Sequence, residues 1–113
     1  MGASTGRTAG SSSVPLNHVQ VRAEAVTDIR EAVERYEGQR PGLGIEFLLE
    51  LDAAIERATI DPEAYAVQYN DARRVLLRRF PYSADYLVEA SVIQIFGVLH
   101  QHRMPLSWQS RLS

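Results

Sequence analysis

The sequence predicts an α+β fold, in which an N-terminal strand precedes an antiparallel helical hairpin packed on a twisted antiparallel sheet of three to four strands. Two stretches with a helical spacing of apolar residues come first, and short runs rich in β-branched and aromatic residues follow them. The connections between those runs are short, and a parallel pair would need a crossover of a dozen or more residues. A chain of 113 residues is about one domain.

The start of the chain differs in composition from the rest. Residues 1–16 are rich in glycine, serine, threonine and alanine and lack the apolar run of a signal peptide. We expect a disordered leader there and one domain over residues 17–113. No later window approaches the roughly 20 apolar residues that a membrane span needs. The chain has no cysteine, which excludes disulfides and thiol catalysis. We therefore expect a cytoplasmic protein that has no contact with a membrane and needs no cofactor.

Charge is distributed unevenly along the chain. Residues 24–63 hold eleven acidic residues and four arginines, a local balance of −7, whereas residues 64–113 hold three acidic residues and six arginines, a balance of +3. Acidic helices and basic strands would give the domain two electrically distinct sides. The alternative is that both are merely solvated faces. Every basic residue is arginine, so no lysine is available to any mechanism.

A short strand and a first helix are expected near the N-terminus. Apolar and polar residues alternate over residues 17–22, as in a strand with one buried face. From Glu24 onward, apolar residues recur at the spacing of one helical face. They are Ala25, Ile29, Ala32, Val33 and Tyr36. This pattern predicts a helix of about three to four turns.

A break separates the first helix from a second one. Pro41 stands among the glycines of residues 39–44, and proline cannot continue a helix. The second helix has its own apolar face, formed by Phe47, Leu48, Leu51, Ile55 and Ala58. Two amphipathic helices joined by so few residues pack antiparallel as a hairpin.

Strand signals fill the rest of the chain. Asp61 before Pro62 predicts a capped short turn, after which helical periodicity ends. The predicted strands are residues 65–69, 73–80, 82–88 and 92–99. Asn70 and Asp71 predict a turn between the first two, and Pro81 ends the second. The run Val92–Leu99 is apolar on both faces, which predicts the central, most buried strand.

Several short motifs occur in a fixed order from Val19 to Arg111. They are the link Pro41-Gly42-Leu43-Gly44, the helix Glu46–Ile55, the turn from Pro62 to Tyr65, the corner Arg79-Phe80-Pro81-Tyr82 followed by Tyr86, a last strand ending in His100, and a tail with Arg103, Pro105, Trp108 and Arg111. Each motif alone is weak, but the ordered set resembles the ParE/RelE superfamily of bacterial toxins. The resemblance extends over nearly all of the chain outside the leader.

This resemblance implies a toxin of a type II toxin-antitoxin system, held inactive in a hetero-oligomer by a cognate antitoxin that wraps around it. Members of the ParE type poison DNA gyrase without catalysing a reaction. Members of the RelE type cleave messenger RNA in the ribosomal A site. A third class would be an inactive relative that only binds an antitoxin. Fold alone does not separate these alternatives.

The chemistry of RNA cleavage gives one criterion, because it needs cations at the phosphate together with a base and an acid. The candidate cations are Arg73, Arg78, Arg79, Arg103 and Arg111. The candidate acids and bases are His100, His102, Tyr82 and Tyr86. If the chain is a ribonuclease, we expect catalysis from His100, Tyr82, Arg79 and Arg103. An acidic chain without lysine departs from the basic RNA-cleaving relatives, which favours the gyrase-directed type.

Each candidate also has a structural interpretation. Tyr82 and Tyr86 are typical of aromatic packing, and Arg79 would suit an ion pair with Glu46 or Glu50 of the second helix. Trp108 would cover an edge of the core or anchor a partner. His100 and His102 project to the same side of an extended segment, but the sequence offers no convincing third ligand, so no metal site is expected.

A free sheet edge or a groove beside the hairpin would suit an added strand or an amphipathic helix of the antitoxin. The expected partner-binding residues are Arg73, Arg78, Arg79, Arg103, Trp108, Arg111 and Leu49.

Overall fold

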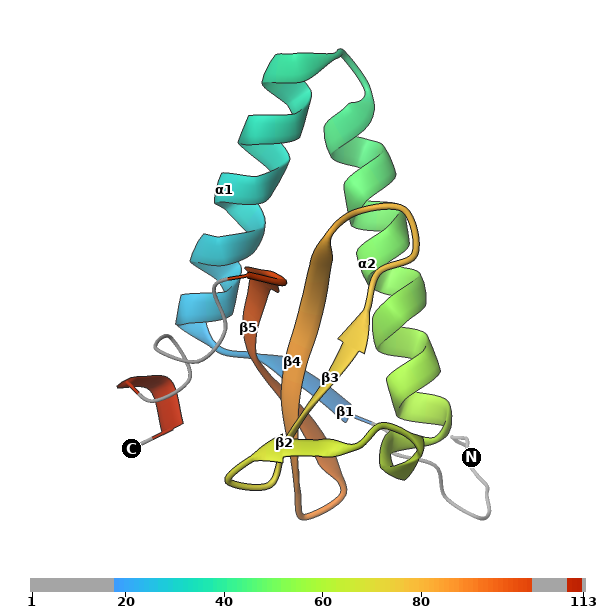
Figure 1. The fold of residues 1–113 in the computed structure, drawn as a ribbon, viewed down its shortest axis with the longest axis vertical. Coiled ribbons are helices and arrows are strands. Elements are labelled where there is room, and N and C mark those ends of the chain that lie inside the picture. The colour runs from blue at the N-terminus through green and yellow to red at the C-terminus, as the bar shows by residue number, and fades with distance from the viewer. Residues whose placement is uncertain (1–17, 103–109, 113) are drawn as a thin grey trace, which may run out of the picture.

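A computed structural model describes residues 18–102 and 110–112 (Figure 1). Its elements are β1 (His18–Val21), α1 (Ala23–Gln39), α2 (Leu43–Ile60), the 3-10 helix η1 (Pro62–Ala64), β2 (Val67–Tyr69), β3 (Ala72–Leu76), β4 (Tyr82–Glu89) and β5 (Val92–His100). The predicted leader, Arg103 and Trp108 lie outside the described residues. Within those residues, no helix has the length and apolar character that crossing a membrane requires.

The two helices form the predicted hairpin, which lies over one face of the sheet (Figure 1). The link between them is tight because Gly42 adopts φ 90°, a left-handed conformation that glycine reaches without strain. At Gly44 a side chain would be crowded, since a Cβ there would stand 3.0 Å from Cγ1 of Val33. The hairpin motif seen in the sequence therefore has a steric basis at both glycines.

Glu37 caps the start of α2 from the end of α1. Its Oε2 accepts a hydrogen bond from the Gly42 N–H at 2.9 Å, and its Oε1 accepts one from the Gly44 N–H at 3.0 Å. Gly42 occupies the cap position and has no side chain that could do this itself. These two backbone hydrogen bonds hold the pKa of Glu37 below its usual range. A carboxylate of one helix thus satisfies the first amides of the next.

The sheet is mixed and has five strands in the order β1-β5-β4-β3-β2. The four C-terminal strands are antiparallel neighbours, as predicted from their short connections. β1 joins the other edge in parallel with β5, pairing Val21 with Ile95. A parallel pair requires a long crossover connection, and here the whole segment from α1 to β4 connects β1 to β5. The predicted central run Val92–Leu99 falls in β5, which is interior, while β4 occupies the middle position.

Two strand boundaries differ from the prediction by more than one residue. β3 ends at Leu76, four residues earlier than expected, because the chain then turns a tight corner. The Tyr82 N–H donates to the Phe80 carbonyl at 2.8 Å, and the Leu77 N–H donates to the Tyr82 carbonyl at 2.9 Å. β2 begins at Val67, because Tyr65 still caps the preceding 3-10 helix. The predicted turn at residues 70–71 is confirmed, with φ 48° and 64°.

An aromatic cluster joins the hairpin to this corner. The ring centroid of Tyr36 in α1 lies 5.5 Å from that of Phe47 in α2 and 4.8 Å from that of Phe80. The Phe47 ring also meets that of Tyr82 edge-on, with centroids 5.2 Å apart. Because these aromatic rings together bury a large apolar area, the cluster fixes the corner against both helices.

Replacing Glu37 with Gln is expected to lower the urea midpoint of unfolding at neutral pH, because the amide nitrogen cannot accept a hydrogen bond. The folded pKa of Glu37 is lowered, so its stabilisation is present above the ordinary value of 4.5 and is lost as the pH falls through the folded value. The variant should therefore lose less stability than the wild type below pH 4.5. Glu34→Gln, an exposed position on the same helix, is the matched control and should leave both profiles unchanged.

Candidate functional site

Tyr82 and His100 are neighbours in the structure. They are register partners on β4 and β5, and their ring centroids lie 5.5 Å apart in an edge-on arrangement. His100 is half-buried, and its ring stacks on that of His102 with centroids 5.2 Å apart. Nδ1 of His100 accepts a hydrogen bond from the His102 N–H at 3.3 Å, so the neutral ring carries its proton on Nε2. The stacking agrees with the prediction that His100 and His102 project to the same side. Tyr82 is only 4% exposed.

The Tyr82 hydroxyl accepts a hydrogen bond from Nη1 of Arg35 on α1. A small cavity of about 40 Å³ lies here, and Tyr82, His100 and Glu31 are among the residues that line it. This volume holds water molecules and excludes a nucleotide. Tyr86, the second candidate tyrosine, is fully buried and donates to the Pro62 carbonyl at 2.7 Å. Burial raises the pKa of Tyr86 to about 12, which keeps its hydroxyl protonated at neutral pH.

Arg111 forms an internal ion pair. Its Nη1 and Nη2 donate to the two carboxylate oxygens of Asp28 at 2.6 and 3.0 Å, and Nη1 also donates to the Phe96 carbonyl at 3.1 Å. The same carboxylate accepts the Val98 N–H at 3.0 Å. The hydrogen bonds to Asp28 raise the pKa of Arg111 above its ordinary value. Gly97 makes room for this contact, because a Cβ there would lie 3.0 Å from Nη1 of Arg111.

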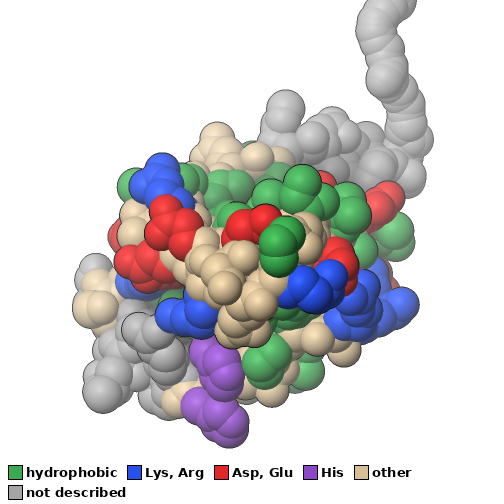
Figure 2. Space-filling model, turned by 90° about the horizontal axis from the view of Figure 1, so that it is seen from above, with side chains coloured by type: hydrophobic (Ala, Val, Ile, Leu, Met, Phe, Trp, Pro, Cys, Tyr) green, Lys and Arg blue, Asp and Glu red, His purple; other side chains and the backbone are tan. Residues whose placement is uncertain are grey.

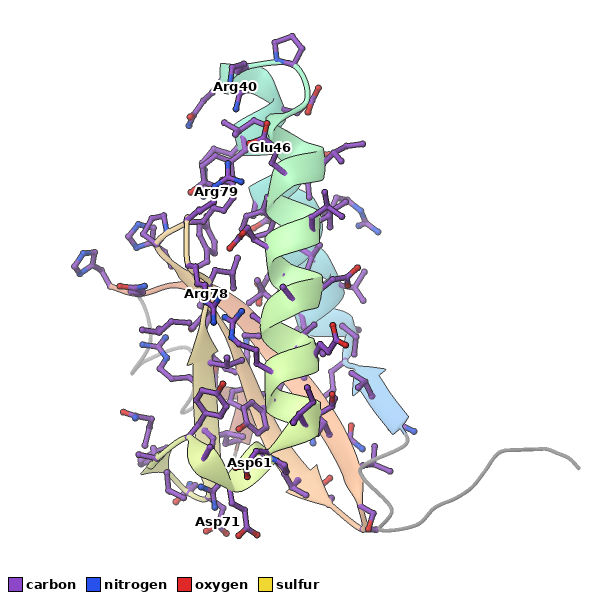
Figure 3. All side chains as sticks on the ribbon, turned by 90° about the vertical axis from the view of Figure 1, so that its right-hand side faces the viewer. Arg40, Glu46, Asp61, Asp71, Arg78 and Arg79 are labelled. Atoms are coloured by element: carbon purple, nitrogen blue, oxygen red, sulfur yellow. The ribbon has the colours of Figure 1, made fainter. Side chains whose placement is uncertain are left out.

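Arg79 pairs with a helix carboxylate, which was one of the two roles expected for it. Its Nη2 lies 2.6 Å from Oε1 of Glu46 on α2, and Arg40 reaches the other oxygen at 3.2 Å. Figure 3 shows the three charged groups converging beside the upper half of α2. The hydrogen bond from Arg79, followed by that from Arg40, lowers the pKa of Glu46. The contacts are solvent-exposed, so they contribute little to stability.

Three other predicted partner-binding residues lie on different segments, Leu49 on α2, Arg73 on β3 and Arg78 in the loop that follows β3. Nη1 of Arg73 is held by the Tyr65 carbonyl at 2.6 Å. Arg78 is exposed beside the end of β3, and its backbone N–H donates to Glu50 at 3.2 Å (Figure 3). Leu49 is 64% exposed on the outer side of α2.

A groove of about 780 Å³ follows the outer edge of β3. Basic groups line it from several elements, namely Arg57 of α2, Arg74 of β3, Arg78 of the following loop and His102. Val75 and Leu77 are buried at its floor, and Leu76 at its wall is 49% exposed. The groove contains no carboxylate among the described residues that line it. Its volume is in the range of small-ligand and short-peptide sites.

Acidic and basic side chains intermix over the tip of the hairpin, and histidine side chains lie together at the lower edge of the molecule in this view (Figure 2). The seam between the acidic helices and the arginine-bearing segments is joined by ion pairs, notably Arg79–Glu46 and Arg111–Asp28. The β3 groove is lined by arginines without a carboxylate among its described lining residues. Across residues 18–102 and 110–112, no group of three or more histidine or carboxylate side chains has a metal-binding arrangement.

Several residues of these sites were not predicted from the sequence, and three of them connect separate elements. Asp28, Arg35 and Arg57 all reach from the helices to the sheet or the chain beyond it. Asp28 had a weak signal, since a carboxylate on the same helical face as Ala25 and Ala32 needs a partner. The partners of Arg35 and Arg57 lie far along the sequence, and no local pattern identifies them.

No protein-family model matches this sequence, and no curated protein matches it. A chain of a solved structure described as the chromosomal ParDE TA system from P. aeruginosa superposes with a TM-score of 0.67 at 16% sequence identity. The match covers 77% of the present chain and 98% of that chain. The α+β fold with its N-terminal strand, two helices and mixed five-stranded sheet is therefore RelE/ParE-like.

Replacing Asp28 with Asn is expected to destabilise the protein by about 2 kcal/mol, because hydrogen bonds to a charged group are lost and the Arg111 guanidinium is left without its counter-charge. Urea unfolding followed by circular dichroism measures the change. Arg22→Ala is the matched control, because the Arg22–Glu89 pair spans 3.8 Å at the surface and should contribute less than about 0.5 kcal/mol. Equal effects of the two variants would contradict a structural role for Asp28.

Proposed function

We propose that this chain is the toxin of a type II toxin-antitoxin system, acts in the cytoplasm, is neutralised by a cognate antitoxin and inhibits growth by binding DNA gyrase. The observation that carries the proposal is the RelE/ParE-like fold, matched over 98% of a chain in a ParDE structure. The ordered motifs from Pro41 to His100 also support it, because they lie in the hairpin, the 3-10 helix, the corner after β3 and the last two strands of this fold.

The positions of the candidate acids and bases favour a non-catalytic toxin. A general acid or base must lie within hydrogen-bonding reach of the substrate. Tyr82 is buried, and its hydroxyl already has Arg35 as a partner. Arg79, the expected cation, is paired with Glu46. The cavity beside His100 is too small for a nucleotide. A toxin that acts by surface binding requires none of these groups to be free.

An antitoxin partner is supported by apolar side chains at the surface. Ile45, Leu49 and Ile60 are 63%, 64% and 73% exposed on the outer side of α2. An amphipathic helix normally turns such side chains toward a neighbour. We therefore infer that the toxin is bound to its antitoxin in a hetero-oligomer.

Induced expression of the chain without its antitoxin in a bacterial host tests the target. We expect growth arrest, induction of the DNA damage response and intact translated messages. Rapid cleavage of translated messages would instead assign the RelE-type endoribonuclease activity. Absence of growth arrest, with antitoxin binding retained, would identify an inactive relative.

The variants Tyr82→Phe and His100→Ala provide the mechanistic prediction. We expect growth inhibition within about twofold of the wild type, because neither side chain acts on a substrate. Loss of a general acid or base would reduce activity by about 10²- to 10⁴-fold. Viable counts after induction measure the effect, and circular dichroism with antitoxin pull-down checks that each variant is folded. Loss of toxicity in a folded variant would point to catalysis.

A further inference from the structure

Two arginine side chains of the β3 groove have no carboxylate partner among the described residues. Arg57 donates from Nη2 to the Leu76 carbonyl at 2.7 Å and forms none of the ion pairs found in the described part of the chain. Arg78 uses its backbone N–H in the contact with Glu50, and its side chain is exposed (Figure 3). A guanidinium has five N–H donors, so both side chains keep donors for an acidic ligand.

An acidic strip lies next to this groove on α2. It consists of the exposed residues Asp52 and Glu56, together with Asp61 at the foot of the helix (Figure 3). None of the three forms an ion pair with another residue of the described ranges. Asp52 and Glu56 stand four positions apart, where like charges on a helix repel each other. A carboxylate at the C-terminal end of a helix, as at Asp61, also opposes the helix dipole. The acidic strip therefore does not stabilise the helix that carries it.

Ile60 separates the acidic strip from the groove. In an α-helix its side chain projects between those of Glu56 and Arg57, about 40° around the axis from the first and about 60° from the second. Ile60 is 73% exposed, the largest fraction among the large apolar side chains of the described residues. Leu76, at the wall of the groove, is 49% exposed. This side of the molecule thus presents acidic groups, an apolar centre and basic groups, in that order.

A surface with this order of groups is complementary to itself. In a two-fold symmetric contact the same patch is used on both copies, so the acidic side of one copy faces the basic side of the other. Ile60 would lie near the two-fold axis against its counterpart. An apolar centre with polar groups around it is the common anatomy of a protein interface. A nucleic acid would satisfy the arginines, but the acidic strip would repel its phosphates.

We propose that two copies of this chain associate through this surface, with the β3 groove of each copy receiving the acidic strip of the other. The contact satisfies Arg57 and Arg78 with carboxylates that have no ion-pair partner within the described part of one copy. Leu49 stands eleven positions before Ile60 on α2, about 16 Å along the axis. The start of α2 therefore stays available to an antitoxin. The proposal does not depend on the toxin function, because it concerns only this chain.

Analytical ultracentrifugation of the full chain, prepared without an antitoxin, measures the association. We expect a concentration-dependent equilibrium between monomer and dimer. Arg78→Glu and Glu56→Arg should each weaken dimerisation by at least about tenfold, because an attractive contact becomes repulsive twice in each symmetric dimer. Arg30→Glu is the matched control, since Arg30 is an exposed arginine of α1 outside this surface. It should associate as the wild type does.

An equimolar mixture of Arg78→Glu and Glu56→Arg tests the pairing directly. In the mixed dimer the altered groove of one chain meets the altered strip of the other, and the two unaltered halves also meet, so both contacts join opposite charges. The mixture should dimerise about as well as the wild type, which a folding defect in either variant would not produce. Circular dichroism checks that each variant is folded.

A monomeric wild type, undiminished association of either variant, or a mixture that stays monomeric would overturn the proposal. A monomeric wild type whose complex with the antitoxin is weakened by Arg78→Glu would assign the groove to the antitoxin instead. The same weakening seen with a short single-stranded RNA would assign it to nucleic acid.

Discussion

The carboxylate of Asp28 connects α1, β5 and the C-terminal residues 110–112. β1 accompanies β5 only to Ile95, because the chain leaves the sheet at Arg22 and enters α1. Asp28 then accepts the Val98 N–H, which a continuing strand would otherwise have bonded, and pairs with Arg111. A buried amide without a partner would cost about 1–3 kcal/mol. The position of α1 over β5 thus depends on the Asp28 carboxylate, which accepts the hydrogen bond that the backbone of a neighbouring strand would otherwise accept.

The arginines of this chain serve two different purposes. Arg111 and Arg79 join carboxylates of the two helices to chain segments more than thirty positions away in the sequence, the separations being 83 and 33 residues. The uneven charge distribution therefore reflects, in part, ion pairs between the helices and later segments of the chain. Arg57 and Arg78 line the β3 groove, and no carboxylate is among the described residues that line it with them. The charge balance counted along the sequence does not distinguish the arginines in ion pairs from those that line the groove. The fold separates the two groups in space.

The fold was predictable where local chemistry determines it. The spacing of residues such as Tyr36 and Phe47 indicated the helical hairpin, and Asn70-Asp71 indicated a turn, because these residue types tolerate left-handed φ angles. Ala90 and Ser91 adopt similar angles of 52° and 64° without such a signal. The early end of β3 depends on hydrogen bonds to Tyr82, and the Arg111–Asp28 pair spans most of the chain. Contacts made at such separations leave no pattern in a single sequence.

The parallel pairing of β1 with β5 has a consequence for synthesis. β1 pairs only with β5, so the backbone hydrogen bonds of β1 cannot form until Ile93, the partner of Val19, has been synthesised. Chains are made from the N-terminus at about 5–20 residues per second, and contacts between distant residues form slowly. The sheet therefore closes only after translation of the domain is almost complete. A growing chain of this topology therefore cannot present its complete sheet until β5 has left the ribosome.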